Sequence, residues 1–133
     1  MPLLLSRHLR SKTQWDLDDA PEFELVKNKK PVAETDLLAL TERHLISAEA
    51  KTKNTLGRNS NERNDAAEKR VLAAKLVMAD QIILATTELS WVESSIKSMK
   101  SAIRAASWDT GAPPRLRIIT GLGTATVTDR FAD

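Results

Sequence analysis

Apolar residues recur at heptad spacing through the second half of the chain. From Ala67 to Ile103 they are separated by steps of three or four residues, and an extra four-residue step near Met78 forms a stutter. Hydrophobic positions spaced in this way line one side of a helix and are typical of coiled coils. The spacing predicts a single helix over 61–107, which would be about 70 Å long at about 1.5 Å per residue.

A shorter helix is predicted ahead of it, over 35–56. Thr35 can cap the free amides of its first turn, and Gly57 is the residue type that most often ends a helix in a left-handed conformation. A polar turn at 58–61 then joins the two helices. Because helices joined by so short a turn fold back on one another, the predicted fold is all-α, a long antiparallel helical hairpin resembling a coiled coil.

The prolines divide the chain into three parts, because no proline occurs between Pro31 and Pro113. The predicted parts are an extended charged N-terminal arm (1–34), the helical hairpin (35–108) and a tail led by proline and glycine (109–133). We expect the arm and the tail to be ordered mainly by contacts with the hairpin or with other chains, because neither holds enough apolar residues for a core.

The tail carries the one signal for strands. Its segments 115–120 and 124–128 are rich in β-branched residues and are separated by Gly121-Leu-Gly123, which predicts a small β-hairpin. Since an isolated hairpin is marginal in water, we expect it to lie on the helices or to extend a neighbouring sheet.

The segment 71–85 is apolar at twelve of its fifteen positions. A helix that is apolar on all sides is buried on all sides, and one short partner helix cannot cover it. This predicts an interface with other protein subunits, as a homo-oligomer or hetero-oligomer. Trp91 is expected either to anchor a partner or to cover the small residues beside it on the predicted helix. The expected interface residues are Val71, Leu72, Leu76, Met78, Ile82, Ile83 and Trp91. The alternative is that the arms fold back over this belt within one chain.

Residues with recognisable chemistry are sparse. The chain has no cysteine, and its two histidines, His8 and His44, have no neighbour at metal-ligand spacing. No phosphate-binding loop and no serine-nucleophile turn is present. We therefore expect no enzyme activity, metal site, cofactor or small-molecule substrate, and interpret the chain as a structural or adaptor subunit of a larger assembly, such as a virus or phage particle or a multi-subunit complex.

Nucleic-acid association is the alternative function, because the net charge is +2 and the pI is about 9.0. Lys97, Lys100 and Arg104 follow one another at i, i+3 and i+7, so they share one face of the predicted helix and are the candidate nucleic-acid contacts. The other interpretation of this face is an ordinary solvated surface. No apolar run reaches the roughly 18 residues of a membrane span, so a soluble protein of a reducing compartment or a particle is expected.

Overall fold

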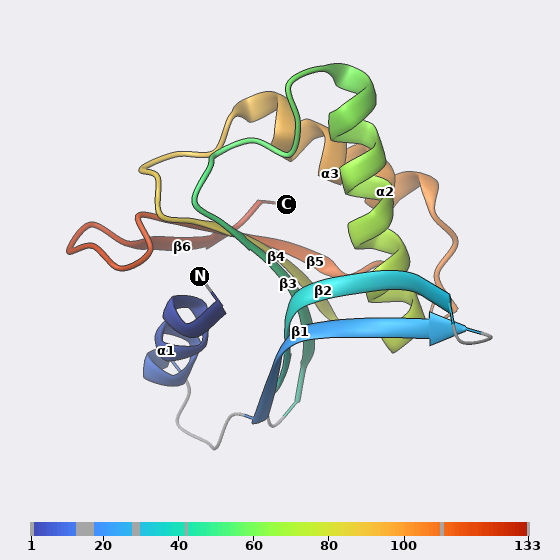
Figure 1. Cartoon of the computed structure of the whole chain (residues 1–133), viewed down its shortest axis with the longest axis horizontal. Coiled ribbons are helices and arrows are strands. Elements are labelled where there is room, and N and C mark those ends of the chain that lie inside the picture. Colours follow the sequence, from blue (N-terminus) through green and yellow to red (C-terminus); the bar gives the residue numbers. More distant parts are fainter. Residues whose placement is uncertain (1, 13–17, 28–29, 42, 110, 133) are drawn as a thin grey trace.

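The computed structural model describes residues 2–12, 18–27, 30–41, 43–109 and 111–132, which form helices on both faces of a mixed sheet (Figure 1). The elements, in chain order, are α1 (Pro2–Lys12), β1 (Asp18–Lys27), β2 (Lys30–Leu40), β3 (Leu45–Lys51), α2 (Ser60–Val77), β4 (Gln81–Thr86), α3 (Glu93–Ala105), β5 (Arg115–Thr120) and β6 (Thr128–Phe131).

The sheet has six strands, which lie side by side in the same order as in the sequence. Strands β1, β2 and β3 form an antiparallel meander, and β3, β4 and β5 run parallel to one another. Strand β6 returns antiparallel to β5. Parallel neighbours need a crossover connection, and α2 and α3 lie within the two connections that this sheet requires.

The all-α prediction is wrong, because the chain forms an α/β fold. The segment predicted as the first helix holds the second half of β2 and all of β3, and the predicted long helix is divided into α2, β4 and α3. The division begins at Met78, which has left-handed backbone angles (φ 56°, ψ 47°) and ends α2. The predicted stutter therefore coincides with the end of a helix, and residues 61–107 do not form the continuous coiled-coil helix that the spacing predicted.

Strand β4 explains why the heptad spacing was misleading. All six of its residues are buried, because the strand lies between β3 and β5 and is covered on both faces. A strand buried on both faces loses the alternation of apolar and polar residues, and its continuous apolar run cannot be distinguished from a buried helix by periodicity. The spacing thus joined apolar residues of three different elements.

Two clusters of buried residues hold the layers together. Ile82 and Leu84 of β4 pack with residues of α2 and α3, whereas Ile83 and Ala85 pack with residues of α1. This alternation is what a strand between two helical layers requires. Figure 1 accordingly shows α2 and α3 on one side of the sheet and α1 on the other.

The N-terminal segment is also not the extended arm that the sequence predicted. Its first helix, α1, buries Leu5 and Leu9 against the sheet, and β1 and β2 form one edge of that sheet. In the tail, β5 occupies one predicted strand, whereas β6 begins at Thr128, four residues later than the second predicted strand. Strand β5 lies between β4 and β6, so it belongs to the main sheet.

The start of α2 is held by a reciprocal cap. The side chain of Asn59 accepts a hydrogen bond from the Glu62 amide (3.0 Å), and the Glu62 carboxylate accepts one from the Arg58 amide (2.8 Å). These bonds satisfy amides that have no partner within the helix. The cap places α2 across β2, β3 and β4, with Ala67, Val71 and other buried residues toward the sheet.

Candidate functional site

The residues predicted as a partner interface are divided by the fold. Four of them, Val71, Ile82, Ile83 and Trp91, are buried within the chain. All of these except Ile83 belong to the cluster beneath α2 and α3. Leu72, Leu76 and Met78 remain exposed, at 40 %, 49 % and 66 % respectively. The exposed three come from α2 and the residue that ends it.

The basic residues predicted as nucleic-acid contacts all lie on α3. Lys97 and Arg104 are exposed, and Lys100 is half-buried. Lys100 and Arg104, together with Arg115 of β5, border a groove of about 400 Å³. Its remaining lining is apolar and consists of Ile103, Pro113, Pro114, Leu116 and Ala132.

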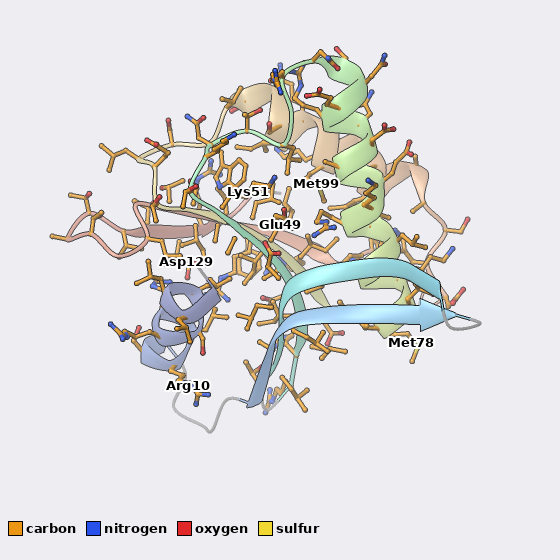
Figure 2. All side chains as sticks on the ribbon, viewed as in Figure 1. Arg10, Glu49, Lys51, Met78, Met99 and Asp129 are labelled. Atoms are coloured by element: carbon orange, nitrogen blue, oxygen red, sulfur yellow. The ribbon has the colours of Figure 1, made fainter. Side chains whose placement is uncertain are left out.

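A different cluster of charged side chains, which the sequence pattern did not indicate, lies between α2 and the sheet. It consists of Asp36 on β2, Glu49 and Lys51 on β3, and Arg70 on α2, and is called the Asp36–Glu49 site below. Figure 2 shows Glu49 and Lys51 on the α2–α3 side of the sheet, with Asp129 nearer to α1.

Strand pairing brings this site together. Leu37 of β2 is paired with Ala48 of β3, so the same antiparallel register continued by one residue sets Asp36 opposite Glu49. Residues directly opposite one another in adjacent strands place their side chains on the same face. Lys51 is two residues beyond Glu49 and shares that face, whereas Ala48 and Ala50 pack on the α1 side.

Hydrogen bonds and ion pairs connect the four residues. One carboxylate oxygen of Asp36, Oδ2, accepts a hydrogen bond of 2.9 Å from the Ala50 amide, which joins β2 to β3 at the site. The two carboxylate oxygens of Glu49 face different cations: Oε1 lies 3.5 Å from Nζ of Lys51, and Oε2 pairs with the Arg70 guanidinium. The side chains of Glu49 and Arg70 are each 12 % exposed, and that of Lys51 is 34 % exposed.

The electrostatics of Glu49 are unusual for a carboxylate with two cationic neighbours. Burial raises the pKa of Glu49 above its ordinary value, and the nearby Asp36 adds to the increase, although Arg70 and Lys51 act in the opposite direction. Strong desolvation together with specific charged partners is characteristic of binding and catalytic sites. Burial and Asp36 together thus have a larger effect on the pKa of Glu49 than its two cationic neighbours have.

The donor set suits a hard divalent cation such as Mg²⁺. Among the described residues, no group of three or more His, Cys, Asp or Glu side chains is placed to hold a metal ion. Mg²⁺ does not require such a group, because it usually keeps several water molecules and is bound by one or two carboxylates together with phosphate oxygens of a substrate. Asp36 and Glu49 supply such a pair of carboxylates.

A second charged cluster lies on the opposite side of the sheet and holds α1 in place. Asp129 of β6 accepts hydrogen bonds from Arg117 of β5 (2.6 and 2.5 Å) and lies 2.8 Å from Nε2 of His8 on α1. Burial acts to raise the pKa of Asp129, but the bonds from Arg117 and His8 outweigh it and lower the pKa. Its bonds link α1 to the β5–β6 pair.

One local signal could have located the Asp36–Glu49 site. The segment 45–51 has the length of a strand and a composition that a strand allows. At its end, the charged residues Glu49 and Lys51 alternate with alanine. Interpreted as a strand, it places Glu49 and Lys51 on one face. Interpreted as part of the helix predicted over 35–56, it separates them by about 200° around the axis at about 100° per residue.

Comparisons with known proteins give no match: no protein-family profile, curated protein or solved structure is similar to this chain. In the part of the chain that the structure describes, no helix is both long enough and apolar enough to cross a membrane.

Proposed function

We propose that this chain is a phosphodiesterase that uses a divalent cation bound by Asp36 and Glu49. The observation that carries the proposal is the placement of two carboxylates from adjacent strands beside Lys51 and Arg70, in a largely buried site. Carboxylates hold the cation, and the basic side chains complement the negative charge of a phosphate group.

Each residue has a distinct role in this reaction. The hydrogen bond from the Ala50 amide fixes the Asp36 carboxylate on β2, next to Glu49 on β3. The cation, when bound, lowers the pKa of a coordinated water molecule and polarises the phosphate. In the proposed reaction the Lys51 ammonium, which is 3.5 Å from the Glu49 carboxylate, stabilises the attacking hydroxide and the charge that develops on the phosphate oxygens.

The reaction is a hydrolysis that needs no oxidant or reductant. The water oxygen forms a bond to phosphorus while the bond from phosphorus to the leaving sugar oxygen breaks. The proton lost by the water is taken up in the end by that oxygen, which leaves as an alcohol. The products are a phosphate monoester and a free hydroxyl group.

Nucleic acid is the substrate class that the surroundings of the site favour. From Ala50 to Asn61 the chain carries Lys51, Lys53 and Arg58 and no acidic residue. This basic segment leads directly from the end of β3 to the start of α2, so it borders the site, and Lys53 and Arg58 are exposed. Exposed cations beside a phosphate-binding site attract a polyanion.

The test is cleavage of end-labelled single-stranded and double-stranded DNA and RNA by the purified full chain, with Mg²⁺, Mn²⁺ or EDTA. We expect cleavage with either cation and none with EDTA. Asp36→Asn and Lys51→Met should each lower the rate at least about 100-fold, because each removes a group that stabilises the transition state.

Asp65→Asn is the matched control, because Asp65 is an exposed carboxylate of α2 outside the site. It should cleave like the wild type, and circular dichroism should show that all three variants are folded. Absence of cation-dependent cleavage by the wild type on every substrate, or full activity of folded Asp36→Asn, would overturn the proposal.

We also propose a contact with a protein partner on the outer face of α2, which would suit the structural or adaptor role inferred from the sequence. Leu72 and Leu76 are exposed there one turn apart, Met78 is exposed at the end of the helix, and neighbouring exposed apolar side chains often mark interaction surfaces. Light scattering after size exclusion should show an oligomer for the wild type and a monomer for Leu72→Ser/Leu76→Ser. A monomeric wild type would exclude self-association through this face.

A further inference from the structure

Arg70 is the one member of the Asp36–Glu49 site that comes from a helix. It extends from α2 to β3 and pairs with Oε2 of Glu49, while Lys51 approaches Oε1. Both oxygens of Glu49 therefore face a cation already present in the protein. A divalent cation that is to be bound by Glu49 has to take the place of one of them.

Arg70 is the partner that can leave. Lys51 is two residues from Glu49 on the same strand, so its side chain starts beside the carboxylate, on the same face of the sheet, in every rotamer. Arg70 is connected to Glu49 only through its own long side chain, and a change of its rotamers moves the guanidinium without moving a strand. Its contact with Glu49 uses one guanidinium nitrogen, Nη1, so it is not the bidentate pair that holds an arginine most firmly.

The charges of the site indicate what has to accompany the divalent cation. Without a metal ion, the two carboxylates, Asp36 and Glu49, are balanced by two cations, Lys51 and Arg70. A divalent cation would leave two excess positive charges in a largely buried site, which is unfavourable at low dielectric. A phosphodiester and the attacking hydroxide each carry one negative charge, so together they restore the balance.

We infer that the Arg70 guanidinium occupies the place of the divalent cation in the metal-free protein, releases Glu49 when the cation binds, and then contacts the substrate phosphate. This inference rests on the proposed phosphodiesterase function and adds a residue to it. Arg70 has two consequences that oppose one another: it weakens binding of the cation, and it stabilises the negative charge of the reacting phosphate. A planar guanidinium with several donors suits the second task.

The variant that separates these effects is Arg70→Gln, with Lys69→Gln as its control. Lys69 is the preceding residue of α2 and is exposed, so its replacement removes the same charge from the same turn without touching Glu49. Mn²⁺ binding is measured by titration calorimetry on the full-length wild type, Arg70→Gln, Lys69→Gln and Asp36→Asn.

We expect Arg70→Gln to bind Mn²⁺ about 10-fold more tightly than the wild type, which is the scale on which groups next to metal ligands change metal affinity. Lys69→Gln should bind like the wild type, and Asp36→Asn should lose binding. At saturating Mn²⁺, Arg70→Gln should nevertheless cleave nucleic acid more slowly than the wild type. Thermal unfolding should show that Arg70→Gln is less stable without Mn²⁺ and that Mn²⁺ restores more stability to it than to the wild type.

The outcomes distinguish this inference from the proposed function. If the wild type binds Mn²⁺ and cleaves, but Arg70→Gln binds Mn²⁺ no more tightly, then Arg70 does not occupy the place of the cation and the inference fails alone. If the wild type binds no Mn²⁺, the metal site and the proposed function fail together. Should Arg70→Gln not fold, Arg70→Met provides the same test, since it also removes the positive charge, and a folded variant that binds Mn²⁺ as weakly as the wild type would overturn the inference.

Discussion

Replacement of Ile83 by alanine tests the central feature of the fold, which is a buried strand where the sequence predicted the middle of a helix. Ile83 is 0 % exposed and lies in β4 between β3 and β5, packed in the cluster that includes Leu5 and Leu9 of α1. The substitution removes three buried carbon atoms, worth about 0.8 kcal/mol each. With the cavity that remains, the expected loss in the free energy of unfolding is about 3–4 kcal/mol.

The control is Leu76→Ala, because Leu76 and Ile83 are seven residues apart and would share one side of the predicted long helix. In the structure, Leu76 is instead half-exposed on α2, so its loss should cost less than about 1 kcal/mol. Urea unfolding monitored by circular dichroism measures the free energy of unfolding of both variants. For a chain of this length the total stability is about 7–20 kcal/mol, so a loss of 3–4 kcal/mol shifts the midpoint clearly.

The result that would refute this reasoning is an equal loss for the two variants. Equal costs would mean that Leu76 and Ile83 have equivalent surroundings, as they would in a single amphipathic helix between subunits. The wild-type spectrum gives a second check, since helices α1, α2 and α3 account for fewer than half of the residues in the fold described above. A spectrum dominated by helix would contradict the six-stranded sheet.

Two further substitutions test other elements. Asp129→Asn should destabilise the fold by about 2–3 kcal/mol at neutral pH, because it weakens the bonds to Arg117 and His8. Since folding lowers the pKa of Asp129 below its ordinary value of 3.8, its contribution is present above that pH and is lost as the pH falls through the lower folded value. Urea midpoints of the two proteins should therefore converge in acid, and a constant difference would contradict this role. Met78→Gly should raise the free energy of unfolding by about 0.5–1 kcal/mol in the same assay. Glycine adopts a φ of 56° without strain, and the Met78 side chain that would be lost is mostly exposed. A lower free energy of unfolding would mean that this side chain contributes more than its exposure indicates.

Local sequence signals determined several boundaries of this fold. The polar turn at 58–61 was expected to precede a helix, and α2 begins at Ser60 with Asn59 as its cap. The β-branched segment at 115–120 was expected to be a strand, and β5 has the same bounds. These signals depend on the chemistry of a few neighbouring residues, namely caps, turns and stiff side chains, so they do not require knowledge of the rest of the chain.

The identity of β3 and β4 was decided only by tertiary structure. Isoleucine, leucine and alanine at these positions pack as well on a helix as in a buried strand, and the sequence around Gln81–Thr86 lacks the alternation of a half-exposed strand. What makes β4 a strand is the presence of β3 and β5 on its two sides, which bond its backbone amides and carbonyls. Those neighbours are distant in the sequence, so no local pattern contains them.

The Asp36–Glu49 site was invisible in the sequence for the same reason. Its carboxylates are separated by the turn between β2 and β3, and Arg70 comes from the helix that follows. Their approach depends on the register that pairs Leu37 with Ala48 and on the position of α2 over those strands. Individually, these four residues resemble the solvated charges of any surface. When they are buried beside one another, Asp36, Lys51 and Arg70 all act on the pKa of Glu49. Burial of this kind is a property of the folded chain.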